Sequence, residues 1–160
     1  MSDAGLTLSG FYKHFASRDR LVAEATSRAF SEGAAWLRPE VPSTSSAPLS
    51  DLLDVYLTPA HRDDAGGGCP VAALATDAAR TPAARKNFNA GFRAFADWVG
   101  GMLDGPERDK RARGAAIICA MAGAVVIARA LDDPKLSDET LQATRRLIEN
   151  ALKGELQSSG

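Results

Sequence analysis

The chain has 160 residues, of which 45% are hydrophobic and 24% are charged, and both values are ordinary for one soluble globular domain with a sizeable core. Its formal net charge is −1, which excludes a protein that binds polyanions over its whole surface, although a single contacting face can still be positive. The longest stretch without a formal charge, residues 114–128, is shorter than the roughly 18 residues of a membrane span, so it predicts a buried helix and no membrane anchor.

Residues 5–21 predict a short helix followed directly by a longer one. Gly5 suits a tight turn because it tolerates positive φ, and Thr7 or Ser9 can cap the short helix. The apolar side of this helix carries residues spaced three and four apart: Leu8, Phe11 and Phe15. The polar side carries three side chains able to donate to phosphate oxygens: Tyr12, Lys13 and His14. Ser17 caps the longer helix, and a short polar-fronted helix braced in this way is typical of a protein that reads the DNA major groove.

The same string resembles the helix-turn-helix signature of the tetracycline-repressor (TetR) family of bacterial transcription factors. In that family an Ala-Gly turn precedes an aromatic-Tyr-x-His-Phe core, and Ser-Lys/Arg-acidic-x-Leu then opens the next helix. Ten residues match this pattern in register: Ala4, Gly5, Thr7, Gly10, Tyr12, His14, Phe15, Ser17, Arg18 and Leu21. The resemblance implies that the residues approaching base edges and sugar-phosphate are Thr7, Ser9, Gly10 and Tyr12. It implies that the residues holding phosphates are Lys13, His14 and Arg18.

Family members carry one whole helix, and most of a second, before this turn, whereas residues 1–4 can supply only the last turn of that second helix. The resemblance therefore implies that residues 1–37 form a partial helix-turn-helix DNA-binding region with its connecting helix. Residues 38–160 are then a ligand-binding and dimerisation domain. Three explanations of the short start stay open: the start codon was assigned too late, the chain was trimmed, or the natural protein lacks the rest.

Helical patterns continue along the chain, and no stretch alternates with period two for long enough to predict a strand. The helix capped by Ser17 is expected to run to Leu37, where two prolines stop it, and residues 38–48 form a Pro/Ser-rich loop. Ser50 is expected to cap a short helix. Residues 58–68, which end in three glycines, are expected to form a turn or mobile loop.

Further helices are expected to begin at Cys69-Pro70, at Thr81-Pro82, at about Glu107 and at Ser137. The last three are expected to end at about Leu103, at Leu131 and at Gly154. The sequence therefore predicts an all-α fold, and the resemblance implies a TetR-like helical bundle.

The last two long helices, residues 107–131 and 137–154, indicate a dimer. The first carries small or apolar side chains on nearly all of its faces. A helix that is apolar on every face must be covered by other protein segments on every face. The second offers one apolar stripe: Leu141, Leu147, Ile148, Ala151 and Leu152. Two such helices from each protomer would make a four-helix interface with two-fold symmetry, and TetR-like proteins dimerise through their last two long helices. The alternative is the ordinary core of a monomer.

The Cys69-Pro70-Val71 sequence after a Gly-rich loop resembles the Gly-Cys-Pro-hydrophobic motif of multidrug-regulator-type TetR ligand domains. A thiol at a helix N-terminus can have a lowered pKa, which would suit a redox sensor, and the alternative is a small buried hydrophobe. Cys69 and Cys119 form no Cys-x-x-Cys pair, so no zinc site is expected. Without a signal peptide, the expected compartment is the reducing cytoplasm.

Aromatic residues at helical spacing indicate either core or the wall of a pocket for a flat, apolar ligand. The candidate ligand-binding residues are Tyr56, Phe88, Phe92, Phe95 and Trp98. For catalysis the chain offers little, because His61 lies in the predicted loop without a neighbouring Ser or Cys nucleophile. His61, Asp63 and Asp64 form only a weak candidate metal site. Neither an enzyme nor a cofactor is expected.

The pattern and the resemblance together predict a ligand-responsive transcriptional regulator. It would be a homodimeric repressor that leaves its DNA operator when a small apolar effector binds the helical domain. The alternative is a truncated dimeric small-molecule-binding protein without operator recognition, because the helices that would bury Leu8, Phe11 and Phe15 are missing from the chain.

Overall fold

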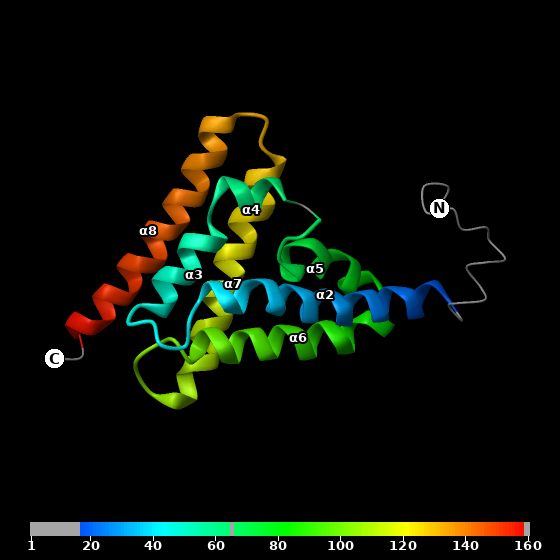
Figure 1. Ribbon diagram of the computed structural model, residues 1–160, viewed down its shortest axis with the longest axis horizontal. Coiled ribbons are helices and arrows are strands. Elements are labelled where there is room, and N and C mark those ends of the chain that lie inside the picture. The colour runs from blue at the N-terminus through cyan, green and yellow to red at the C-terminus, as the bar shows by residue number, and fades with distance from the viewer. Residues whose placement is uncertain (1–16, 65, 159–160) are drawn as a thin grey trace.

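The computed structural model describes residues 17–64 and 66–158, with side chains described as far as Lys153. The regular structure of these residues is entirely helical (Figure 1), which confirms the predicted all-α fold. The helices are α2 (Arg18–Glu40), α3 (Pro48–Tyr56), α4 (Pro59–Asp63), α5 (Pro70–Arg80), α6 (Pro82–Gly100), α7 (Glu107–Ala130) and α8 (Pro134–Ser158). The predicted DNA-reading helix, in residues 1–16, lies outside the described residues.

Several helices begin where the sequence predicts. Ser17 caps α2, since its Oγ accepts a hydrogen bond of 3.1 Å from the backbone N–H of Arg20. Helices α5 and α6 begin at Pro70 and Pro82 as predicted, because proline has the backbone angle of the first helical turn and needs no donor there. The same preference explains why the prediction of a cap at Ser50 was wrong: α3 already begins at Pro48.

Two other boundaries differ from the predictions. Helix α2 passes through Pro39 and ends at Glu40, because a proline in the last turn removes only one backbone hydrogen bond, and the Val41 N–H still bonds to the Arg38 carbonyl at 3.2 Å. Helix α8 begins at Pro134 rather than at Ser137, and it continues past Gly154. Its start is stabilised by Asp133, whose Oδ1 accepts from the backbone N–H groups of the next turn, at 2.9 and 3.2 Å.

Helix α4 is the element that the sequence analysis missed, because residues 58–68 were predicted as a turn or mobile loop. Thr58 caps this short helix, accepting from the backbone N–H of His61 at 3.2 Å. After it, the Asp64 Oδ1 accepts from the Gly67 N–H at 2.8 Å and closes the glycine turn. His61 is only 4% exposed, so its prediction as a loop histidine was wrong.

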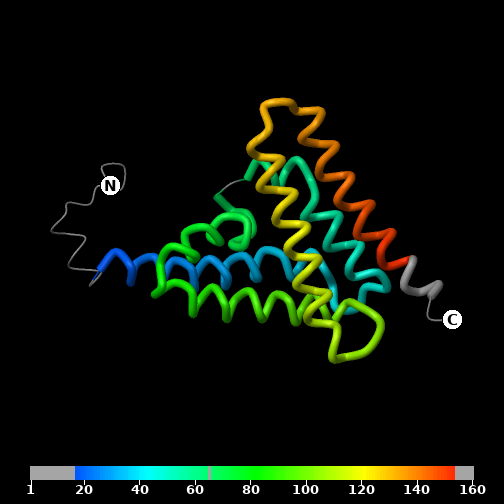
Figure 2. The backbone as a smooth tube through the Cα atoms, turned by 180° about the vertical axis from the view of Figure 1, so that it is seen from behind, coloured from blue at the N-terminus to red at the C-terminus, as the bar shows by residue number. Residues whose placement is uncertain are grey.

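The helices form two groups (Figures 1 and 2). Helices α2 and α6 lie side by side, with α5 against them, and the first turn of α2 points away from the rest of the molecule. Helices α7 and α8 form a second, antiparallel pair, with α3 and α4 on one of its faces. The two groups share one core, whose fully buried large residues include Leu52, Leu53, Tyr56, Val99, Ile118, Met121, Val125 and Leu141.

Helix α7 crosses α6 at very short range. A Cβ atom at Gly100 would lie 2.6 Å from the Lys110 carbonyl oxygen, and one at Gly114 would meet the Ala96 carbonyl oxygen. Both glycines therefore permit backbone to pack on backbone. Helix α7 also has the length and hydropathy of a membrane span, but the core helix of a soluble protein meets the same criterion, and Ile118, Met121 and Val125 are buried in the shared core.

Candidate ligand-binding pocket

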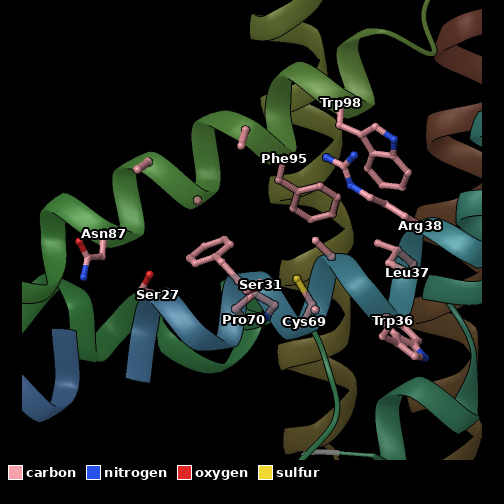
Figure 3. Close-up of a pocket in the computed structure, with 16 residues that line it drawn as sticks. Ser27, Ser31, Trp36, Leu37, Arg38, Cys69, Pro70, Asn87, Phe95 and Trp98 are labelled. Carbon is pink, nitrogen blue, oxygen red and sulfur yellow. The ribbon is translucent and has the colours of Figure 1, made fainter. Parts of the chain in front are cut away.

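A cavity of about 340 Å³ lies between α2, α5 and α6 (Figure 3). Its walls are mainly apolar, and four aromatic side chains line it: Phe30 and Trp36 from α2, and Phe95 and Trp98 from α6. The volume falls within the range of small-molecule sites, roughly 300–1,000 Å³. Both tryptophans of the chain lie in this pocket.

Small residues create the space. The lining includes Gly33 and Ala34 on α2 and Gly91 on α6. A Cβ atom at Gly91 would collide with the Phe30 ring, and one at Gly33 would lie 2.9 Å from the Pro70 Cδ. The two glycines therefore let α2 lie against α5 and α6 while the aromatic rings hold the cavity open.

The two ends of the pocket differ in polarity. At one end lie Ser27 and Asn87 (Figure 3), and the Asn87 Nδ2 donates a 2.7 Å hydrogen bond to the Ala23 carbonyl. At the other end the Arg38 guanidinium lies over the Trp98 ring, 5.6 Å from its centre. Of the lining residues that the structure describes, Arg38 is the one that carries a charge.

The aromatic residues singled out in the sequence fall into three places. Phe95 and Trp98 line the pocket, and their rings stack at 5.9 Å. Phe88 and Phe92 stack on each other at 6.3 Å beside the pocket, where Phe88 also supports Phe30 edge to face at 5.4 Å. Tyr56 lies in the core and not in the lining. Ligand binding by these residues stays a prediction.

Cys69 joins the pocket to the core. Its thiol lines the pocket, but the residue is only 3% exposed, and burial raises the pKa of the thiol. Of the two interpretations of Cys69, the small buried hydrophobe therefore describes this residue, and the thiol of lowered pKa does not. Tyr56 is fully buried nearby, and burial together with the neighbouring Cys69 thiol raises the pKa of its phenol. Among the described residues its hydroxyl makes no hydrogen bond of normal geometry.

His61 holds the start of α5 in place. Its Nδ1 lies 2.7 Å from the Tyr56 carbonyl oxygen and its Nε2 accepts from the Cys69 backbone N–H at 3.1 Å. These partners require a neutral ring with its proton on Nδ1, and burial lowers the pKa of His61 accordingly. Both ring nitrogens are thus occupied by backbone groups, so the weak metal-site interpretation has no free imidazole ligand.

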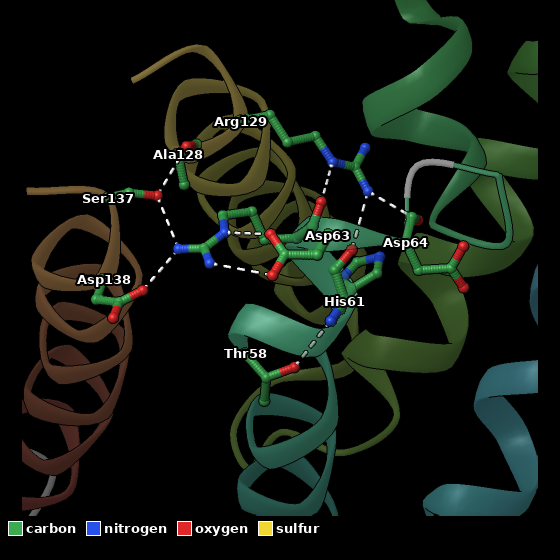
Figure 4. Close-up of polar contacts among 9 residues, drawn as sticks. Thr58, His61, Asp63, Asp64, Ala128, Arg129, Ser137 and Asp138 are labelled. Carbon is green, nitrogen blue, oxygen red and sulfur yellow. Dashed lines mark hydrogen bonds and ion pairs between the residues drawn. The ribbon is translucent and has the colours of Figure 1, made fainter. Parts of the chain in front are cut away.

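Two arginines tie α4 to α7 and α8 (Figure 4). Arg129 of α7 donates to the carbonyls at the end of α4, namely those of His61, Arg62 and Asp64, at 2.8–3.1 Å. Arg62 bonds to Ser137 and Asp138 of α8 at 2.9 and 2.6 Å. Its hydrogen bond to Asp63 lowers the pKa of that carboxyl. Since Trp36 of the pocket lies 5.3 Å from the His61 ring, α4 connects the pocket with the last two helices.

Apolar residues are exposed on both α7 and α8, and in Figure 2 α7 lies in front with no helix over it. Within residues 114–130 of α7, the exposed residues are all small or apolar: Ala116, Cys119, Gly123, Val126, Ile127 and Ala130. On α8 the exposed apolar residues include Leu136, Ala143, Leu147 and Ala151, and they alternate with exposed charged or polar residues such as Glu139, Gln142 and Arg146. The single stripe predicted for the last helix was therefore wrong: Leu141 and Ile148 face the core of the same chain, whereas Leu147 is 66% exposed.

Sequence reasoning missed Trp36, Arg38 and Gly91 as pocket residues. Trp36 and Arg38 lie near the end of α2, and only the packing of α2 on α6 brings them to Trp98. A glycine inside a helical pattern, as at Gly91, is a signal of close packing that could have been used. Of the predicted DNA contacts, Arg18 is exposed in the first turn of α2, and the other six lie outside the described residues.

No protein-family model and no curated protein matches the sequence. Among solved structures, the chain is similar to a TetR-family transcriptional regulator from Agrobacterium tumefaciens. The TM-score is 0.70 and the sequence identity 23%, over 93% of this chain and 82% of that one. This similarity shows that the chain has the helical fold of a TetR-family regulator.

Proposed function

We propose that this protein is a cytoplasmic, ligand-responsive transcriptional regulator of the TetR type, and a repressor. Residues 1–37 would contribute the DNA-binding region with its connecting helix, and residues 38–160 the ligand-binding and dimerisation domain. The observation that carries the proposal is the position of the pocket. One of its walls is α2, the helix that follows the predicted DNA-reading segment directly.

A ligand in this pocket would act by changing the position of α2. The lining combines Phe30 and Trp36 of α2 with Phe95 and Trp98 of α6, so a ligand bound between the two helices would alter their spacing. The first turn of α2 would then move with the DNA-reading helix attached to it. The ligand releases DNA only if it binds the displaced arrangement more tightly than the DNA-bound one.

Dimerisation makes such a displacement effective, because the DNA-reading helices of the two protomers must match the two half-sites of one operator at once. The exposed apolar residues of α7 and α8 support a dimer formed through these helices. Gly123 supports it further, since a Cβ atom there would meet nothing within 4 Å in the protomer, and a glycine on an open helix face allows a second helix to approach closely.

Replacing Leu147 with Glu tests the dimer. A carboxylate in the middle of an apolar interface should convert the dimer into a monomer, as measured by sedimentation equilibrium. Ala75→Glu is the matched control, because Ala75 is exposed on α5, away from the α7 and α8 face, and should leave the dimer intact. A wild-type monomer, or an unchanged dimer in Leu147→Glu, would contradict this interface.

Selection of DNA from a random library by the full chain tests the regulator itself. A dimeric reader should enrich a two-fold symmetric site. Lys13→Ala and Arg18→Ala should weaken binding to that site similarly for all sequences and reduce its salt dependence. Arg108→Ala, which removes an exposed arginine of α7, should have no effect. If no site is enriched, the better account is a dimeric small-molecule-binding protein without operator recognition.

A further inference from the structure

We infer that the pocket between α2 and α6 takes a flat, apolar ligand that carries one negative charge, with Arg38 as the counter-ion. This inference rests on the proposed ligand pocket and names the chemical class of its ligand. It follows from the distribution of charge in the lining, from the geometry of Arg38 and from the shape of the cavity.

The charge of the lining is unbalanced. Among the described residues of the lining, Arg38 is the only charged one and none is a carboxylate. Arg28, on the same helix, is paired with Glu32 at 2.6 Å. By contrast, Arg38 has neither an ion pair nor a hydrogen bond with any side chain that the structure describes. An anion that entered the pocket would therefore meet an available positive charge, whereas a cation would meet repulsion.

The geometry of Arg38 fits a planar anion. Its guanidinium lies against the Trp98 ring at 5.6 Å, and Figure 3 shows it beside Trp98 and directed toward Phe95. A guanidinium held over an aromatic face by a cation–π contact keeps N–H groups available, and these groups bind carboxylates through two parallel hydrogen bonds. The charged group of the ligand is thus expected at the Trp98 end of the pocket.

The remaining walls fit an apolar body. Phe30 and Phe95 present rings from the two helices, and the volume of about 340 Å³ lies at the small end of known ligand sites. Apart from Arg38, the polar side chains of the described lining are neutral: Ser27, Ser31 and Asn87. This combination fits a compact aromatic acid of about two fused rings better than a cationic or strongly polar ligand.

Calorimetric titration with three probes of one shape and different charge tests the inference. The probes are naphthalene-2-carboxylate, naphthalene-2-carboxamide and naphthalene-2-methylamine. The carboxylate should bind the wild-type protein at least about tenfold more tightly than the amide, since charge-assisted hydrogen bonds exceed neutral ones by this amount. The amine should bind most weakly.

The Arg38→Gln variant should lose this preference and bind the carboxylate and the amide with equal affinity. Arg38→Lys, which keeps the charge, should retain part of it. Arg28→Gln removes the same charge from the same helix outside the lining and should retain the full preference. Circular dichroism of each variant establishes that it is folded.

The outcomes separate the inference from the proposed function. If the amide or the amine binds as tightly as the carboxylate, or if Arg38→Gln keeps the preference for the carboxylate, the inference about charge is wrong, although a ligand pocket remains. If none of the three probes binds the wild-type protein, both the pocket's proposed role and the inference about its ligand fail.

Discussion

Helix α6 packs against two neighbours in two different ways. Against α7 it packs backbone on backbone: Cβ atoms at Gly100 and Gly114 would meet main-chain atoms of the opposite helix. Against α2 it packs through side chains: a Cβ atom at Gly91 would meet the Phe30 ring. Both contacts depend on glycine, but the contact with α2 encloses the apolar cavity lined by both tryptophans, whereas the hollow between α6 and α7 is more open and lined by several charged side chains.

The difference shows where this fold can move. Main-chain atoms of two helices in contact cannot be displaced without moving a whole helix, whereas a side chain such as Phe30 can change its rotamer. A ligand would therefore separate α2 from α6 more readily than it would separate α6 from α7. Four substitutions, each aimed at one part of this contrast, should have effects of decreasing size.

The largest effect is expected for Gly114→Ala. The added methyl group collides with the Ala96 carbonyl oxygen and lies close to the Gly100 backbone, so the crossing of α6 and α7 must open. Overpacking of this kind costs about 3 kcal/mol of unfolding free energy, well above the roughly 1 kcal/mol that alanine gains over glycine in a helix. Urea denaturation measures the loss.

Gly101→Ala is the matched control, because it is the same substitution beside the same crossing at an exposed position, where the added Cβ atom would lie 3.4 Å from its nearest neighbour. It should change the unfolding free energy by less than about 1 kcal/mol. A loss in Gly114→Ala no greater than in this control would contradict the rigid crossing.

Gly91→Ala should have a smaller effect on stability and a larger one on the pocket. The new methyl group displaces the Phe30 ring, and the gain in helix propensity offsets part of the strain, so the unfolding free energy should fall by about 1 kcal/mol. The displaced ring changes the shape of the cavity, and naphthalene-2-carboxylate should bind at least about tenfold more weakly. An unchanged affinity of the variant for naphthalene-2-carboxylate, measured by calorimetry, would show that the ligand does not lie beside Phe30.

Helix α4 lies between the fixed and the adjustable contacts. On one side the His61 ring contacts Trp36 of the pocket, and on the other Arg129 of α7 binds the carbonyls at the end of α4. A ligand that moves Trp36 would therefore act on α4, which Arg129 bonds to α7.

The sequence predicts the fixed part of this molecule better than the adjustable part. Pro70 and Pro82 each mark a helix start, because proline acts locally on its own backbone. Thr58-Pro59 carries the same helix-start signal as Thr81-Pro82. The three glycines at 66–68 nevertheless favoured the prediction of a loop for this segment.

The pocket could not be predicted from local sequence signals in the same way. The spacing of Phe88, Phe92 and Phe95 places them broadly on one side of α6, but the rotation of α6 against α2 decides which of them lines the cavity. Trp36 and Arg38 reach the same cavity from a helix about 60 positions earlier in the chain, and no pattern in one segment can reveal that contact.

A smaller, pH-dependent effect is expected from His61. Burial lowers its pKa below the ordinary 6.5, so the unfolded chain binds more protons than the folded one in the window between the two values. The unfolding free energy should therefore fall as the pH drops below about 6.5. Arg129 adds to the effect by its positive charge, and Asp64 opposes it.

Denaturation of wild type and of His61→Gln at pH 7.5 and pH 5.5 measures this contribution, because the pH dependence should be weaker in the variant. His14→Gln, which replaces the other histidine of the chain, should retain it. Equal pH dependence in wild type and His61→Gln would mean that His61 is not held neutral by the Cys69 N–H.

The smallest effect is expected for Tyr56→Phe. The Tyr56 hydroxyl is fully buried without a hydrogen-bond partner among the described residues, so its removal should leave stability unchanged or raise it by up to about 1 kcal/mol. Because Tyr56 does not line the pocket, the affinity for naphthalene-2-carboxylate should stay within about twofold of wild type. A clear loss of stability would indicate a stabilising contact between the hydroxyl and the Cys69 thiol, and a clear loss of affinity would place Tyr56 in the ligand site after all.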